Sequence, residues 1–337
     1  MRLDIEFHIG DRQKPVIIFI HGLGMDKNLW CSPCEARIGG GLFPFSLLSR
    51  KRPDEFILKD PPPIMPEILT TGTPLSWLTT SYHDLREDGY TVVTWSQRRP
   101  VGPVVIAVKE LAAVIKFISS LDLQKKDSFD NQIILIGHSR GGLIARKYIE
   151  LYGNKGISAL ITIATPHHGS TMAEWVGHIS MIVSILKPFL KHLPEGRISK
   201  AIKRISDFFR SEAIKELLPD SSFIKSLQPI RNIKCYSLAG IDPHLFSLYR
   251  WDVKKVEDTF VVRPEEFFSY PESLIRLLPD RLVPSEWRSG AGDGLVSLES
   301  ARFGSRCCEL KLNHANILTD KEARAFIREI VKDLNGL

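Results

Sequence analysis

The sequence predicts an α/β protein, with a mostly parallel sheet covered by helices on both faces and a helical cap inserted between two strands. Short apolar runs alternate with longer segments of helical periodicity, which is the pattern of repeated βαβ units. Two of the apolar runs end in glycine-rich turns, at 21–24 and 137–142. One long stretch, 172–228, shows helical periodicity only and therefore interrupts the alternation.

The first half of the chain supplies most of the expected sheet. The β-branched run Val16–Ile20 predicts a buried parallel strand that stops in the loop His21-Gly22-Leu23-Gly24. A segment rich in Pro and Gly, about 25–74, is expected to be an inserted loop region. The elements expected after it are helices over 75–87, 103–121 and 141–152 and strands over 90–95, 132–136 and 157–163.

The second half adds the cap and the last strands. Within 172–228, Ile198, Ile202, Ile205 and Phe209 recur at the spacing of an amphipathic helix. The elements expected beyond it are a strand over 233–238, a second insertion over about 241–289, a strand over 307–312 and a helix from 319. We therefore predict one core, formed by 1–171 and 229–337 with both insertions, and a helical cap or lid over 172–228.

Composition narrows the function classes. The chain has 337 residues, of which 43% are hydrophobic and 25% charged, as in ordinary folded proteins. The net charge of +6 favours acidic partners, and anionic lipid surfaces are compatible with it. Lys and Arg are nevertheless spread along the chain, without a dense basic block or an aromatic platform, so nucleic-acid binding is not expected.

Segments that would direct the chain to another compartment are not expected either. The N-terminal stretch lacks the charged and apolar regions of a signal peptide, and the most apolar later stretch, 175–193, is broken by charged residues and a proline. Five cysteines, an odd number, fit reduced thiols, so we expect a cytoplasmic location. Cys31 and Cys34 have the spacing of a metal or redox pair, but a structural or incidental role is expected because the strand-to-helix context of a redox motif is missing.

Ser139 is the predicted nucleophile. The strand residues 133–136 lead directly into Gly137-His138-Ser139-Arg140-Gly141, and a helix-forming stretch follows. This is the GxSxG pattern in its strand-turn-helix setting, where glycines two positions either side leave room for a sharp turn. A serine is a poor nucleophile near neutral pH, so a base has to lie beside it.

Two backbone N–H groups are expected to stabilise the negative charge that develops during attack on a carbonyl. The turn aims the Arg140 N–H and the helix N-terminus at that charge. The second donor is expected from the loop after the neighbouring strand, where glycines let the backbone approach, and there the Leu23 N–H is the predicted donor.

His314 is the predicted base, because in this arrangement the acid and then the histidine follow the serine along the chain. It lies between the last expected strand and the last expected helix. For the acid, Asp293 stands between two glycines that would let its carboxylate approach the imidazole, and Asp242 is the alternative, since it follows its strand more closely. His21, His138, His167 and His168 also gather at expected strand ends, where neutral rings bonded to loop backbone are the commoner arrangement; we expect no metal and no cofactor.

The motifs described above resemble those of the lipase branch of the α/β-hydrolases, near bacterial triacylglycerol lipases and lipase-like esterases. The residues that carry the resemblance are 19–24, 136–146, 164–170, 217–227, 292–297 and 313–314. The resemblance implies an α/β-hydrolase fold, a triad at Ser139, Asp293 and His314, oxyanion donors at Leu23 and Arg140, and a helical lid. The two insertions match no segment of the family that we recognise, which affects the substrate more than the chemistry.

The sequence therefore predicts a carboxylic ester hydrolase that acts on hydrophobic acyl esters through an acyl-enzyme. One interpretation of the cap is that it docks on a lipid surface. An acyltransferase or a phospholipid or GPI-type deacylase would use the same triad. A binding protein that kept the fold without catalysis is a third alternative. The sequence does not distinguish oligomeric states.

Overall fold

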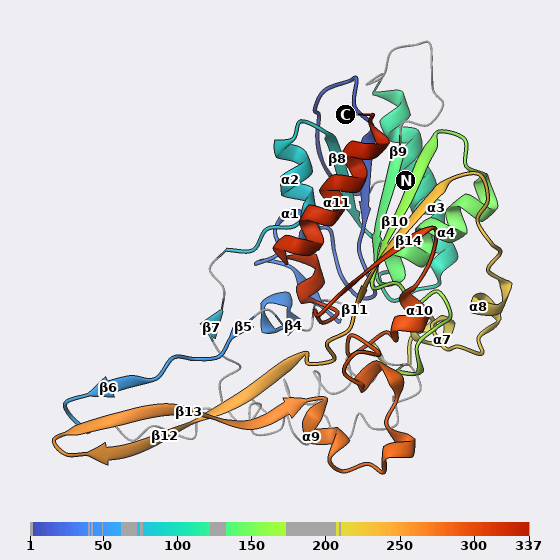
Figure 1. Ribbon diagram of the computed structural model, residues 1–337. Coiled ribbons are helices and arrows are strands. Elements are labelled where there is room, and N and C mark those ends of the chain that lie inside the picture. The colour runs from blue at the N-terminus through green and yellow to red at the C-terminus, as the bar shows by residue number, and fades with distance from the viewer. Residues whose placement is uncertain are drawn as a thin grey trace.

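The computed structural model describes residues 3–39, 41, 43–48, 50–61, 73–74, 77–121, 133–172, 207–208 and 210–336. Its centre is a seven-stranded sheet in the order β1-β8-β2-β9-β10-β11-β14 (Figure 1). The strands are β1 (Asp4–His8), β2 (Val16–Ile20), β8 (Thr91–Ser96), β9 (Ile133–His138), β10 (Ile157–Ile163), β11 (Lys234–Gly240) and β14 (Arg306–Leu310). Among these seven strands only β1 runs antiparallel to its neighbour, so the predicted mostly parallel sheet is confirmed.

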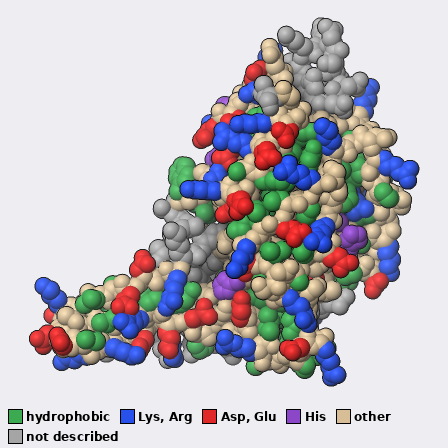
Figure 2. Space-filling model, viewed as in Figure 1, with side chains coloured by type: hydrophobic (Ala, Val, Ile, Leu, Met, Phe, Trp, Pro, Cys, Tyr) green, Lys and Arg blue, Asp and Glu red, His purple; other side chains and the backbone are tan. Residues whose placement is uncertain are grey.

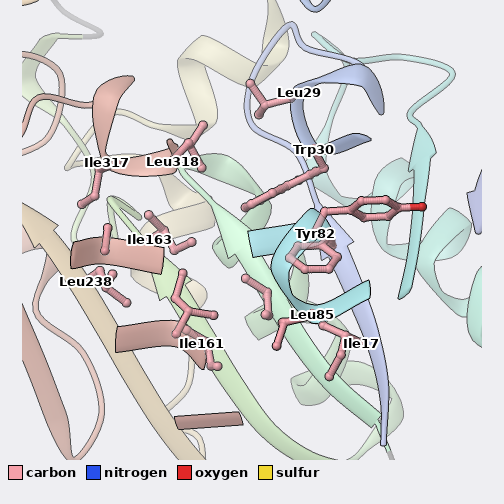
Figure 3. Close-up of a cluster of buried hydrophobic side chains, with 14 of the residues drawn as sticks. Ile17, Leu29, Trp30, Tyr82, Leu85, Ile161, Ile163, Leu238, Ile317 and Leu318 are labelled. Carbon is pink, nitrogen blue, oxygen red and sulfur yellow. The ribbon is translucent and has the colours of Figure 1, made fainter. Parts of the chain in front are cut away.

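Helices cover both faces of the sheet. For this reason β2 and β9, which lie in its middle, bury every residue. On one face pack α1 (Asn28–Cys31), α2 (Ser81–Glu87) and α11 (Lys321–Leu334). Figure 3 shows Trp30, Tyr82 and Leu85 from this layer against Ile17 and Ile161 of the sheet. On the other face pack α3 (Val104–Ser120) and α4 (Arg140–Tyr152).

The helix expected over 75–87 begins later than predicted. Thr80 is the N-cap of α2, and its hydroxyl and the side chain of His83 satisfy each other's backbone N–H groups in a capping box. The Thr80 hydroxyl also donates to the carbonyl of Trp30 at 2.6 Å. Residues 77–80 therefore precede the helix, and Thr80 ties α2 to α1, while 75–76 lie outside the described residues.

Strands from the two insertions meet in one sheet, which the sequence did not predict. Strands β12 (Phe246–Val256) and β13 (Thr259–Tyr270) make a long hairpin, and β6 (Phe56–Leu58) from the first insertion pairs with β13. The Phe56 and Trp251 rings lie 5.4 Å apart, and Glu55 pairs with Arg263 at 2.7 Å. This three-stranded arm projects from the core (Figure 1), and Figure 2 shows acidic and basic side chains mixed along it.

Short elements fill the remaining loops. They are β3 (Arg37–Ile38), β4 (Phe43–Pro44), η1 (Phe45–Leu47), β5 (Arg50–Lys51), β7 (Thr73–Pro74), α7 (Glu212–Glu216), α8 (Ser222–Ser226), α9 (Glu272–Ile275), η3 (Asp280–Leu282), η4 (Ser285–Trp287), α10 (Leu298–Ala301) and η5 (Asn316–Leu318).

Within the predicted cap, 172–228, the structure describes residues 172, 207–208 and 210–228. This part contains α7 and α8, which pack with Leu143 of α4. The predicted amphipathic helix at Ile198, Ile202, Ile205 and Phe209 lies outside the described residues. None of the helices in the described part of the chain is long and apolar enough to cross a bilayer.

Candidate active site

Ser139 sits at the turn between β9 and α4 with φ of 54° and ψ of −128°. A non-glycine residue in this region is strained, and such strain is characteristic of functional turns. The neighbouring glycines make the turn feasible: a Cβ on Gly137 would collide with the backbone of Gly141 and Gly142, and a Cβ on Gly141 would collide with the carbonyl of Ile20. The turn predicted from GxSxG is therefore present.

The loop after β2 lies directly against this turn. An added Cβ on Gly22 would stand 3.1 Å from the Ser139 Cβ, so the glycine permits a close approach of the two backbones. Leu23 lines the same cavity as Ser139. Arg140 is the first residue of α4, and the first N–H groups of a helix have no intrahelical acceptor. Both predicted oxyanion residues therefore adjoin the serine.

His314 and Asp293 form a buried pair. The His314 Nδ1 lies 2.8 Å from the Asp293 Oδ2, and the side chains are 7% and 1% exposed. The other carboxylate oxygen accepts the N–H groups of Leu295 and Val296 at 3.0 and 2.7 Å. Because the carboxylate accepts, Nδ1 carries a proton, and Nε2 is the ring nitrogen left available for a second partner.

Asp242, the alternative acid, is engaged elsewhere. Its carboxylate accepts the backbone N–H of His244 at 3.0 Å and so closes its own loop. The carboxylate in hydrogen-bond contact with the His314 ring is that of Asp293.

The glycines around Asp293 make close contacts with the second insertion. Gly292 leaves room for the backbone of Glu286, and Gly294 has a φ of 95° and packs on the carbonyl of Pro243. They fold the acid loop against the second insertion. Gly240 at the end of β11 also leaves room for the acid, because an added Cβ there would stand 2.8 Å from the Asp293 Cβ.

A cavity of about 310 Å³ opens at Ser139 and His314. This volume is near the lower end of small-molecule pockets, about 300 to 1,000 Å³. Its walls are mostly apolar, and among them are Leu23, Met172, Phe208, Ile214, Leu217 and Leu295. The segment predicted as the cap, 172–228, supplies four of these six residues.

Three histidines near the strand ends are buried and neutral. Burial lowers the pKa of His21 to about 4, and it holds the pKa values of His138 and His167 well below the usual value. The His138 Nε2 donates to the carbonyl of His314 at 3.0 Å, which joins the serine turn to the histidine loop. His168, by contrast, is exposed. Within the described ranges, no three His, Cys, Asp or Glu side chains are grouped as metal ligands would be.

Cys31 and Cys34 carry free thiols. Burial raises the pKa of Cys31 to about 11, whereas a redox or metal-binding cysteine needs a thiolate.

Two residues that support the site were not predicted. The Asn313 amide donates to the carbonyl of His244, and its oxygen accepts the N–H groups of Ala315 and Asn316. The buried Glu286 carboxylate accepts the N–H and hydroxyl of Thr171 at 2.8 and 2.7 Å. Asn313 adjoins the predicted base and so had a sequence signal, but nothing in the sequence marks Glu286.

This fold and this site define a serine ester hydrolase of the α/β-hydrolase class. A family model of palmitoyl protein thioesterase matches residues 92–269, which is more than half of the chain. The chain belongs to the palmitoyl protein thioesterase family. The matched range contains Ser139 and Arg140 but ends before Asp293 and His314.

Solved structures show the same fold. The mature form of the Bacillus licheniformis lipase BlEst2 is similar with a TM-score of 0.53 and 14% identity, covering 97% of each chain. Its propeptide form gives a TM-score of 0.51 at 14% identity, covering 98% of this chain and 53% of that chain. No curated protein sequence matches the chain. At this identity the likeness concerns the fold alone.

Proposed function

We propose that the chain hydrolyses esters and thioesters of hydrophobic acyl groups, with Ser139 as nucleophile, His314 as general base and Asp293 as the orienting acid. The observation that carries the proposal is an apolar cavity that opens at Ser139 beside the buried pair of His314 and Asp293. The thioester part follows the family, whose name describes action on palmitoyl thioesters of proteins.

The chemistry proceeds through an acyl-enzyme. The Ser139 oxygen attacks the carbonyl carbon while the His314 Nε2 takes its proton, and the Leu23 and Arg140 N–H groups stabilise the oxyanion. The imidazolium, stabilised by Asp293, then gives the proton to the departing alcohol or thiol. Water repeats the sequence on the acyl-enzyme, which releases the carboxylic acid and the serine.

The cap is part of this proposal. We assign the acyl chain to the apolar cavity, whose wall includes Phe208, Ile214 and Leu217 from 172–228. The core would then be 1–171 with 229–337, as predicted. Arg146 of α4 supports this division, because its guanidinium donates to the carbonyls of Leu227 and Gln228 where the cap returns to the core.

The test compares acyl thioesters and p-nitrophenyl esters of increasing chain length on wild type and Ser139→Ala. We expect turnover to rise with chain length over the shorter acyl chains, and Ser139→Ala to lower kcat by about 10⁴-fold or more. Ser119→Ala, which alters an exposed serine on α3, is the matched control and should leave kcat unchanged. Full turnover by Ser139→Ala would refute the proposal, and formation of an acyl ester with added ethanol would identify acyl transfer instead.

A further inference from the structure

His21 lies beneath the loop that carries the Leu23 N–H. It follows β2 directly, and its side chain is 0% exposed. Both ring nitrogens have backbone partners: the Gln97 N–H donates to Nε2 at 3.1 Å, and Nδ1 lies 3.0 Å from the carbonyl oxygen of Gly22. The ring therefore connects the end of β8 to the loop after β2.

These contacts determine which nitrogen carries the proton. A backbone N–H can only donate, so the Nε2 facing Gln97 has to accept and bears no hydrogen. The proton of the neutral ring is then on Nδ1, which donates to the Gly22 carbonyl. The Gln97 side-chain nitrogen also lies 3.3 Å from Nδ1, and it directs its hydrogen to the His21 carbonyl at 3.1 Å instead. Burial, with the Arg140 guanidinium nearby, lowers the pKa of His21 to about 4, so the ring keeps this form at neutral pH.

The Gly22 carbonyl and the Leu23 N–H belong to the same peptide group. In a planar trans peptide the C=O and N–H bonds point in opposite directions. A carbonyl held toward the buried imidazole therefore directs the Leu23 N–H away from it, toward the cavity that Gly22, Leu23 and Ser139 line. We propose that His21 is a positioning residue that holds the Leu23 N–H toward the reacting carbonyl of the substrate.

The glycine makes such a constraint necessary. Gly22 has wide conformational freedom, so rotation of the Gly22-Leu23 peptide would cost little without the imidazole. Rotation would replace a donor by a carbonyl oxygen at the place where negative charge develops. The bond from His21 removes that alternative before the substrate arrives.

Hydrogen bonds from the same residues also reach Arg140, whose N–H is the second proposed oxyanion donor. Gln97 donates from its side-chain amide to the His21 carbonyl at 3.1 Å, and the Arg140 guanidinium donates to the Gln97 side-chain oxygen at 3.0 Å. Gly24 and Arg140 also share the Pro100 carbonyl as acceptor. The backbone donors of Leu23 and Arg140 therefore rest on one buried hydrogen-bond network.

The inference rests on the proposed function, since it assigns the Leu23 N–H to the oxyanion. The test compares His21→Phe, which keeps a flat ring without its nitrogens, with His21→Asn, whose amide nitrogen replaces Nδ1 as donor. We expect His21→Phe to lower kcat by about 10²- to 10³-fold, the usual effect of losing one oxyanion donor, with KM changed less than about threefold. His21→Asn should stay within about tenfold of wild type, and affinity for a trifluoromethyl ketone transition-state analogue should fall in parallel with kcat.

His167→Phe is the matched control, because His167 is also a buried neutral histidine but does not line the cavity. It should lower the melting temperature without lowering kcat. If His21→Phe retains kcat, or if both His21 variants lose kcat only in proportion to stability, the inference is wrong.

Nuclear magnetic resonance of ¹⁵N-labelled histidines tests the constraint in the unaltered protein. The His21 ring, assigned by its absence in His21→Phe, should show a neutral Nδ1–H form from about pH 5 to 9. An Nε2–H form, or titration near 6.5, would overturn the inference whatever the catalytic residues are. Full turnover by Ser139→Ala would instead refute the proposed function, so the two failures are distinguishable.

Discussion

The two sides of the cavity are held together by different kinds of contact. On the nucleophile side, the loops after β2 and β9 come from adjacent strands, and glycines let their backbones touch. On the acid side, Asp293 and His314 come from separate loops, and two bonds join them: the side-chain bond between the imidazole and the carboxylate, and the bond from the His314 N–H to the Asp293 carbonyl at 3.0 Å. Close backbone packing therefore builds the nucleophile side, whereas the acid side combines a backbone bond with a bond between polar side chains.

Histidines on the nucleophile side and at the base of the arm have pKa values shifted in opposite directions. His21 and His138 bond to backbone groups and have lowered pKa values, because burial disfavours the cation. His244, at the base of the arm, lies 3.3 Å from the Glu272 carboxylate, whose hydrogen bond raises its pKa; Asp242 and Glu266 act in the same direction, and burial opposes them. The surroundings of His21 and His138 therefore favour the neutral ring, whereas those of His244 favour the protonated one.

The largest expected effect distinguishes the two acids. Asp293→Asn should lower kcat by about 10³- to 10⁴-fold, because an amide no longer holds the imidazole in the form with a free Nε2. Asp242→Asn is the matched variant and should change kcat less than about threefold, since it alters a loop bond only. Steady-state kinetics on one ester measure both, and the reverse order would make Asp242 the acid.

The pH dependence of stability should differ between the two sides. Between its folded pKa of about 4 and an unfolded value near 6.5, His21 binds a proton only in the unfolded chain, so acidification favours unfolding by about 3 kcal/mol at pH 4. His138 and His167 add to the loss in the same direction. For His244 the sign is opposite: its contribution is fully present below its unfolded pKa and is lost as pH rises through the raised folded value.

Denaturant unfolding between about pH 4.5 and 8.5 measures both effects. His21→Asn should reduce the fall in the free energy of unfolding at low pH. His244→Asn should remove only the small fall in that free energy at high pH, since His244 is half-buried and screened by solvent. If the free energy of unfolding falls as steeply with decreasing pH in His21→Asn as in wild type, His21 is not the group responsible.

The smallest expected effect concerns the support of the histidine loop. Asn313→Ala removes a bond to His244 and the acceptor for two N–H groups, and we expect it to lower the free energy of unfolding by about 1 to 2 kcal/mol. A fall in kcat of less than about tenfold should accompany it, because His314 keeps Asp293 as partner. Asn154→Ala removes an exposed bond to a distant carbonyl and should cost less than about 0.5 kcal/mol. Equal losses in the two variants would contradict the special role of Asn313.

Much of the core was predictable. Strands over 16–20 and 157–163 were located to the residue, and β8, β9, β11 and β14 within about two residues, because buried β-branched runs are a local signal. The edge strand β1 was not among the predicted strands. The arm was not predicted, since β6 acquires its partner only in β13, about 200 residues further along the chain. Nor was the late start of α2, which depends on the contact of Thr80 with Trp30.

The sequence by itself determined the turn that carries Ser139, because a sharp bend between a strand and a helix requires glycines at set positions, and that requirement is visible in the residue types. It also limited the proposed base to His314 and the proposed acid to two residues. Only the tertiary structure distinguished Asp293 from Asp242 as the partner of the imidazole, joined the two insertions into one arm and enclosed an apolar cavity beside the serine. Hydrogen bonds and packing between distant segments depend on where the whole chain brings them, and no local pattern encodes that meeting.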